Sequence, residues 1–405
     1  MLRKGNVKIR RLGLPGLALL GLIFLSGCWD YRELNELSLA MAIGIDKDAK
    51  TGDYRVTFQI VNSKEIAGRN ATGAVAPVAV FTESGETVFE AVRKVALKGS
   101  RRISLQHLRD LVIGERLARE GVKELFDLLE RDHESRLTTR VYIARGTDAE
   151  TLLKTLTPID EIPANAILGK IQLAESTVGE NYEVQLVEAI HGIYRKNAGL
   201  AISGIKLTGP ETTGRKRANL MHTDPPAALK VAGMAVMKNG KLVGWLNRNE
   251  TRGVAWINNK LKSTIVNLKC EPKGKIAVET YGSATKLKAD VRDDRPVIRI
   301  IIKQTGKVGE ANCPVDLTKS DEIKKLEQQW EAITVHEVKQ AVKLAKRLNS
   351  DILGFGEAVQ RDRPKAWKAM EKEWGELFRT CKAEVTVETV LLRTGMTTKS
   401  SMTNK

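Results

Sequence analysis

The chain has 405 residues, of which 42% are hydrophobic and 28% charged, and its formal net charge is +17. This length allows two or three domains with cores of their own, and the composition is that of a globular protein. Beyond the N-terminal region no stretch approaches 18 consecutive apolar residues, which excludes a second membrane crossing.

The N-terminus follows the order of a bacterial lipoprotein signal peptide. Basic residues without any acid come first, and an apolar run over 12–25, too short for a membrane span, follows them. Small residues then precede the cysteine in Leu25-Ser26-Gly27-Cys28. We expect cleavage between Gly27 and Cys28 to remove residues 1–27, and acyl chains on Cys28 to hold the protein on a lipid bilayer. The alternative is an ordinary secretory signal with an accidental cysteine.

The remaining chain is strongly basic. Residues 1–27 carry five of the positive charges, which leaves +12 for the rest. Such a surface suits either an anionic lipid headgroup layer or nucleic acid. Because the signal exports the protein, we expect no nucleic acid partner. The densest basic clusters, 101–102 and 215–217, lack interleaved aromatic residues. We interpret them first as solvated loops, and second as patches that face lipid or a partner.

Alternating strand and helix patterns predict a mixed α/β domain over 28–208. The predicted strands are 37–45, 53–62, 78–81, 108–113, 139–144 and 202–207. The predicted helices are 87–98, 115–131, 149–156, 167–176 and 184–195. The segment 63–76 is rich in Ala, Gly and polar residues and indicates an exposed loop rather than a recognition loop.

A segment rich in Pro and Gly, 209–227, predicts a linker or a long surface loop. Its sequence over 209–216, G-P-E-T-T-G-R-K, is similar to a phosphate-binding loop. However, Arg215 stands where such a loop needs Lys, and Lys216 where it needs a Ser or Thr for magnesium. We therefore expect no nucleotide site.

A second domain is predicted over 228–395, followed by a polar tail over 396–405. It opens with a hairpin, 231–237 and 242–246, around Asn239-Gly240, the pair that a type I′ turn prefers. A short helix is expected at 251–258. Further strands, which indicate an antiparallel sheet, are predicted at 265–268, 276–281, 285–291 and 297–303.

A helix of about 35 residues should follow, capped by Thr318 with Asp321 in capping-box spacing. The next predicted helix, 364–378, carries Trp367, Trp374 and Phe378 on one side. For these aromatic side chains we favour core packing over a ligand site or a partner interface. A last strand begins near residue 385. The expected fold class is thus α/β, in the sense of mixed α+β, with several domains.

Three cysteines remain after Cys28: Cys270, Cys313 and Cys381. They form no C-x-x-C pattern, so neither a zinc knuckle nor a thioredoxin-type site is expected. A disulfide between Cys270 and Cys313 is one interpretation, and three buried free thiols is another.

Sequence patterns for catalysis are missing. The chain has no G-x-S-x-G, its five histidines are scattered without a metal-binding spacing, and no pair of acids stands out. We therefore expect no enzyme activity and assign no catalytic residue, cofactor or metal site.

Motifs at both ends of the chain carry a family resemblance. The first is Leu25-Ser26-Gly27-Cys28-Trp29-Asp30-Tyr31-Arg32-Glu33-Leu34-Asn35. The second is D-I-L-G-F-G over 351–356, followed by the aromatic residues of 364–378 and by Arg393-Thr394-Gly395. Together they resemble the Ger(x)C lipoproteins, the C subunits of spore germinant receptors in Bacillus-type bacteria.

The resemblance implies an α/β fold in several domains and a complex with the A and B subunits, which are integral membrane proteins. It places the protein, anchored through Cys28, on the outer leaflet of the spore inner membrane, where nutrients trigger germination. Whether this subunit contacts the small-molecule germinant stays open.

Two other classes of protein are considered. A solute-binding lipoprotein of a transport system would need a deep cleft between domains. A cell-wall lytic enzyme would need two carboxylates about 5–10 Å apart.

Overall fold

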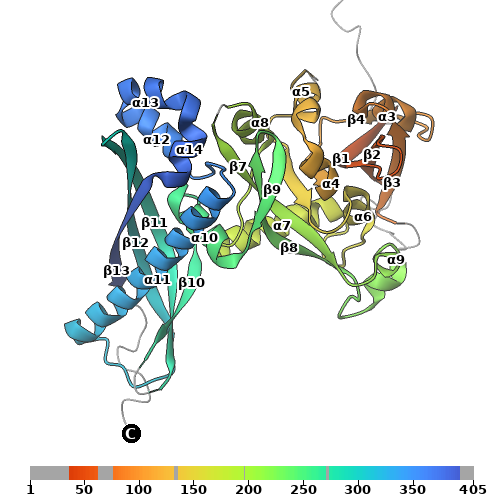
Figure 1. Ribbon diagram of the computed structural model, residues 1–405. Coiled ribbons are helices and arrows are strands. Elements are labelled where there is room, and N and C mark those ends of the chain that lie inside the picture. Colours follow the sequence, from red (N-terminus) through yellow and green to blue (C-terminus); the bar gives the residue numbers. More distant parts are fainter. Residues whose placement is uncertain (1–35, 63–75, 132–135, 196, 271–272, 393–405) are drawn as a thin grey trace, which may run out of the picture.

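The computed structural model describes residues 36–62, 76–131, 136–195, 197–270 and 273–392. It contains two sheets, each with its own helices, and Figure 1 shows them side by side with α10 between them. The expected mixed α/β class is confirmed, as is a C-terminal part that combines a largely antiparallel sheet with a long helix. The proposed lipidation site Cys28, most of the expected loop 63–76 and the polar tail lie outside the described residues.

The first sheet has the strand order β3-β2-β1-β5-β6-β7-β8-β9, with β4 paired to the beginning of β1. Its strands are β1 (Leu37–Lys47), β2 (Tyr54–Val61), β3 (Val78–Gly85), β4 (Arg102–Ser104), β5 (Asp110–Gly114), β6 (Arg140–Ala144), β7 (Gly199–Thr208), β8 (Ala228–Lys238) and β9 (Lys241–Leu246). The central strands β1, β5, β6 and β7 are parallel, whereas the outer ones pair antiparallel. All five residues of β5 are buried, because helices cover both faces at the parallel centre.

One face of the first sheet packs against α3 (Val88–Val95), α4 (Glu115–Glu120), α5 (Lys123–Arg131) and α8 (Leu186–Tyr194). The other face packs against α6 (Ala149–Lys154) and α7 (Pro163–Thr177). The prediction of a single helix over 115–131 is wrong. Gly121, with a φ of 141°, ends α4, and α5 starts two residues later. Such a φ is readily adopted only by glycine.

The segment 209–227 contains two short helical turns, α9 (Glu211–Gly214) and η2 (Arg217–Met221). Buried Asn219 holds it in place, because its side-chain amide donates to the carbonyls of Leu156 and Ala227 at 3.2 and 2.8 Å. The strands after it, β8 and β9, pair within the first sheet. The domain limits drawn from the sequence stay a prediction.

The hairpin of β8 and β9 is confirmed. Asn239 and Gly240 form its turn with φ values of 51° and 79°, as a type I′ turn requires. Here the two turn residues alone determine the connection.

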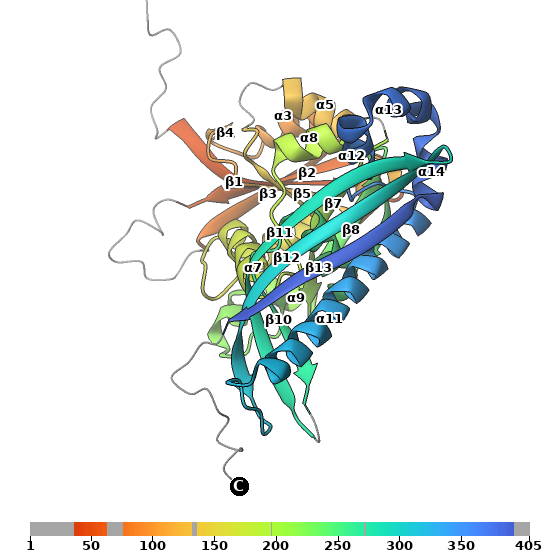
Figure 2. The ribbon, with the colours of Figure 1, turned by 90° about the vertical axis from the view of Figure 1, so that its left-hand side faces the viewer.

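The second sheet has the order β10-β11-β12-β13, with β10 (Thr264–Lys269), β11 (Lys275–Arg292), β12 (Arg295–Ala311) and β13 (Lys382–Leu392). The strands predicted at 276–281 and 285–291 are one continuous strand, β11. The pairs β10–β11 and β11–β12 are antiparallel, but β13 lies parallel to β12. Figure 2 shows the long helix α11 (Ser320–Arg347) running diagonally along this sheet.

The long helix is confirmed, although it has 28 residues and begins at Ser320. The expected cap by Thr318 is wrong, because its hydroxyl donates to the Asp316 carboxylate at 2.6 Å instead. The single helix predicted over 364–378 is divided into α13 (Pro364–Met370), η3 (Glu371–Glu373) and α14 (Trp374–Thr380). It is preceded by α12 (Phe355–Asp362).

Candidate functional site

The two halves of the protein meet where α10 (Arg248–Ile257), which follows β9, packs against α11. We call this contact, together with the loop after α11, the joint. Gly253 lets the two helices approach closely, because a Cβ atom at this position would lie 2.3 Å from the Glu337 carbonyl oxygen. Since that oxygen belongs to the backbone of α11, only glycine fits without moving a helix.

A buried ion pair crosses the joint. The guanidinium of Arg252 on α10 donates to the carboxylate of Glu337 on α11, and both side chains are buried. The indole of Trp256 donates to the same carboxylate at 3.1 Å. Burial raises the pKa of Glu337, and the facing guanidinium opposes this rise. Breaking such a pair leaves an uncompensated charge in the interior, so the network holds the two helices in one arrangement.

Asp351 organises the loop after α11. One carboxylate oxygen accepts from the Phe355 amide at 3.0 Å, and the other accepts from the Gly356 amide at 2.7 Å and the Trp374 indole at 3.0 Å. Its backbone carbonyl accepts from the Gly199 amide of β7 at 3.0 Å. Burial raises the pKa of Asp351 despite these donors. The motif D-I-L-G-F-G is therefore a structural junction that ties the first sheet to the start of α12.

The aromatic residues after this motif form one buried cluster. The ring centroids of Trp367 and Trp374 are 5.2 Å apart, and those of Trp374 and Phe378 are 6.3 Å apart. Phe355 packs edge-on against Phe378 at 5.9 Å. All four side chains belong to the hydrophobic core, so the interpretation as core packing is confirmed.

Sequence reasoning missed the ion pair of the joint. Glu337 lies seven residues after Trp330, which is fully buried, and so falls on the apolar side of α11. A charged residue at that spacing was the available signal, since a charge on a buried helix face needs a partner.

A pocket of about 580 Å³ lies between the two halves, beside the joint. Its charged and amide side chains already bind one another or the backbone. Arg195 pairs with Glu357, Lys260 with Glu188 at 2.9 Å, and the Asn258 amide donates to the Ile352 carbonyl at 2.9 Å. These pairings stabilise the contact between the two halves.

A second pocket, of about 500 Å³, lies between α7 and β8. Leu173 and Val231 contribute apolar surface to it, and Arg145 lies beside them. The Arg145 guanidinium donates to the Ala232 carbonyl at 2.8 Å and stacks over the Trp245 ring at 4.6 Å. This cation thus binds the backbone of β8 where its pairing with β7 shifts register.

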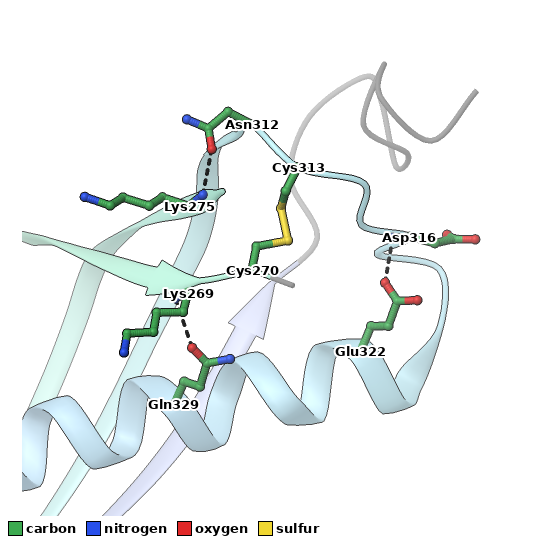
Figure 3. The surroundings of a disulfide bond; sticks show 8 residues. All are labelled: Lys269, Cys270, Lys275, Asn312, Cys313, Asp316, Glu322 and Gln329. Carbon is green, nitrogen blue, oxygen red and sulfur yellow. Dashed lines mark hydrogen bonds between the residues drawn. A yellow bond between two sulfur atoms is a disulfide. The ribbon is translucent and has the colours of Figure 1, made fainter. Parts of the chain in front are cut away.

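Cys270 and Cys313 form a disulfide, with their Cα atoms 6.3 Å apart (Figure 3). The bond joins the end of β10 to the segment after β12, where the Lys275 amide donates to the Asn312 side chain at 2.7 Å. The alternative of three free thiols is wrong. Disulfides persist in oxidising compartments, which agrees with the export expected from the signal sequence. Cys381 is buried and free, and burial raises the pKa of its thiol to about 11.

Across the described residues, no group of three or more His, Cys, Asp or Glu side chains is arranged to hold a metal ion. Within the same part of the chain, none of the helices combines the length and apolar character needed to cross a bilayer.

Comparisons with known proteins cover almost the whole chain. The family model described as "Spore germination protein N-terminal domain" matches residues 30–207, and "Spore germination B3/ GerAC like, C-terminal" matches residues 232–395. Spore germination protein KC of Bacillus subtilis (strain 168) is 32% identical over 395 residues, which cover 96% of this chain and 97% of that protein. Spore germination protein B3 of the same organism is 26% identical over 368 residues, covering 88% of this chain and 91% of that protein.

A solved structure shares the fold. The crystal structure of the GerBC protein aligns with a TM-score of 0.56 at 18% sequence identity, and covers 90% of this chain and 100% of that one. The two family models, the 32% identical relative and the shared fold agree. The chain therefore belongs to the spore germination GerAC family, the family of germinant receptor C subunits.

Proposed function

We propose that this protein is the lipid-anchored C subunit of a spore germinant receptor and acts with the membrane A and B subunits in nutrient-triggered germination. Acyl chains on Cys28 hold it on the outer leaflet of the spore inner membrane. The observation that carries the proposal is the lipoprotein motif Leu25-Ser26-Gly27-Cys28 at the head of a chain whose remaining length belongs to this family.

The mechanism is non-enzymatic and works through protein contacts. The joint supports this view, because a buried ion pair, a close helix contact and the Asp351 junction connect the two halves firmly. A subunit built in this way moves as a single rigid unit, so that it transmits a movement of one membrane partner to the other.

Replacing the lipidated residue tests the anchor. Cys28→Ala should release the protein from spore membranes and slow germination, whereas Ser26→Ala keeps a small residue before the cysteine and should change neither. Membrane fractionation, mass spectrometry of the mature N-terminus and germination rate are the three measurements. A Cys28→Ala protein that stays with the membrane in spores that germinate normally would contradict the proposal.

Affinity capture tests the partners. The tagged protein, extracted from spore membranes with detergent, should bring down two polytopic proteins. Isothermal titration of the mature protein with amino acids, sugars and nucleosides distinguishes the alternative of a solute-binding lipoprotein. Tight direct binding together with an absence of polytopic partners would favour that alternative.

A further inference from the structure

One corner of the first sheet lies next to the point where the described chain begins. Strand β4 pairs with the first residues of β1, so that Arg102 is the partner of Leu37. Helix α3 precedes β4 in the chain, and Figure 1 shows β4, α3 and the start of β1 at the same end of the molecule. Because Leu37 follows Cys28 by nine residues, a lipid at Cys28 lies within about 30 Å of this corner.

This corner is basic. The 19 residues from Ala91 to Arg109 contain no acid. Their basic residues are Arg93, Lys94, Lys98, Arg101, Arg102 and Arg109. Lys94 and Lys98 pair with Glu90 and Glu83, both at 2.7 Å. Arg101 is exposed and forms no ion pair with a described residue, so its charge stays available.

The same corner exposes large apolar side chains. Helix α3 buries Val88, Ala91 and Val95 against the sheet and leaves its other face uncovered. Leu97 is 86% exposed and Phe89 is 55% exposed. Phe89 and Arg93 lie four residues apart and so share one side of the helix, and Leu97 follows two residues after the end of the helix.

Within this group the Arg93 guanidinium lies over the Phe89 ring at 4.9 Å. We call Phe89, Arg93, Leu97 and Arg101 the α3–β4 patch. Aromatic and aliphatic side chains interleaved with arginine are typical of surfaces that lie at the level of lipid headgroups.

We propose that the α3–β4 patch rests on the anionic bilayer to which Cys28 is anchored. Phe89 and Leu97 reach the boundary between headgroups and acyl chains, and Arg93 and Arg101 lie among the lipid phosphates. This inference rests on the proposed lipid anchor and extends it, because it assigns the side of the protein that faces the membrane. The opposite face of the first sheet, with α6 and α7, then points away from the bilayer and is open to partners.

A fluorescent probe tests the apolar part of the patch. The purified lipidated protein with Leu97→Cys is labelled with a polarity-sensitive dye and bound to phosphatidylcholine vesicles with or without phosphatidylglycerol. Labelling is specific, because Cys270 and Cys313 form a disulfide and Cys381 is buried. With phosphatidylglycerol present, the emission should shift to the blue and nitroxide-labelled headgroups should quench it.

The matched control is Ile159→Cys. Its side chain is 92% exposed and lies in the connection between α6 and α7, which cover the opposite face of the sheet. The control dye should keep the emission of a dye in water. A dye at position 97 that also stays in water, or that shifts no more than the control, would overturn the proposal.

Charge reversal tests the basic part. The mature chain with Cys28→Ala, which lacks the lipid, should bind phosphatidylglycerol vesicles weakly in a flotation assay at low salt. Arg101→Glu should weaken this binding roughly ten- to thirty-fold, since each unit of charge near an anionic surface changes affinity about five-fold. Arg217→Glu, at an exposed position of η2, is the matched control and should weaken binding by no more than two-fold, roughly, as expected beyond a Debye length. Equal losses for the two variants would overturn the proposal.

The outcomes separate this inference from the proposed anchor. If the lipidated chain stays with vesicles at high salt while the dye at position 97 remains in water, the membrane contact of the patch is refuted and the lipid anchor is supported. If the lipidated chain leaves the vesicles at high salt, the anchor is wrong, and the comparison of Arg101→Glu with Arg217→Glu still decides about the patch. If the dye at position 97 is buried only when membrane subunits are present, the patch binds protein and the proposal fails.

Discussion

Substituting Gly253 tests whether the joint is as tight as its geometry indicates. A methyl group at this position would lie 2.3 Å from the Glu337 carbonyl oxygen and 2.6 Å from the Ala341 side chain. Both atoms belong to α11, so room for the methyl group arises only if the two helices separate. We therefore expect Gly253→Ala to destabilise the protein even though alanine is the better helix former.

The magnitude follows from two opposing contributions. Alanine in place of glycine inside a helix gains about 1 kcal/mol. Overpacking a well-filled contact costs about 1–3 kcal/mol, and the upper end applies where the obstacle is backbone. The free energy of unfolding of Gly253→Ala should thus fall by about 1–2 kcal/mol.

Gly169→Ala is the matched control, because this residue of α7 has no other atom within 4 Å of the position of a Cβ. It should gain about 0.5–1 kcal/mol. Urea unfolding of the mature protein, followed by tryptophan fluorescence, measures both variants, since the buried Trp256 and Trp330 lie on α10 and α11. If Gly253→Ala stabilises the protein as much as the control does, the close contact of α10 with α11 is refuted.

Three further predictions concern single interactions. Burial raises the pKa of Asp46 from 3.8 to about 6, so the unfolded chain loses this proton at a lower pH than the folded protein does. The free energy of unfolding should therefore fall as the pH rises from about 4 to about 6. Asp46→Asn should remove up to about 3 kcal/mol of that fall, measured by urea unfolding at a series of pH values. Replacing both Cys270 and Cys313 with alanine opens a bond that spans 43 residues and should lower the free energy of unfolding by about 4 kcal/mol; an unchanged midpoint in urea would argue against the bond. Asp351→Asn turns an amide group toward N–H donors and should lower the free energy of unfolding by about 1–3 kcal/mol. It should also alter the near-ultraviolet circular dichroism of Trp374, and an unaltered spectrum would show that the donors find other partners.

Elements whose determinants are local could be predicted from the sequence. The Asn239-Gly240 turn and the alternating strands beside it depend on neighbouring residues, and they were found where expected. The division of 115–131 was missed because the apolar pattern continues across Gly121, whose positive φ ends α4, while both helices pack into the same core. The parallel pairing of β13 with β12 was also missed, since residues about 85 positions apart decide it and no local pattern reports the direction.

The features of the candidate site also depend on residues that are far apart in the sequence. The motif D-I-L-G-F-G was visible as a family signature, but its role was not, because the carboxylate of Asp351 binds groups on α12 and α14 and its carbonyl binds β7. The disulfide was one of two interpretations, since the spacing of three cysteines selects no pair. The position of the α3–β4 patch near the start of β1 could not be predicted, because it depends on the pairing of β4 with β1. The three residues of β4 are too few to give a strand pattern in the sequence.

The late position of β13 has a consequence for biosynthesis. The strand occupies the last described residues, and its partner β12 was made about 85 residues earlier. Until residue 392 has been synthesised, the edge of β12 that faces β13 is unpaired and can bind other unfolded chains. Stop codons very late in the reading frame should therefore be as harmful as early ones, and a truncated product would be an easy substrate for quality-control proteases.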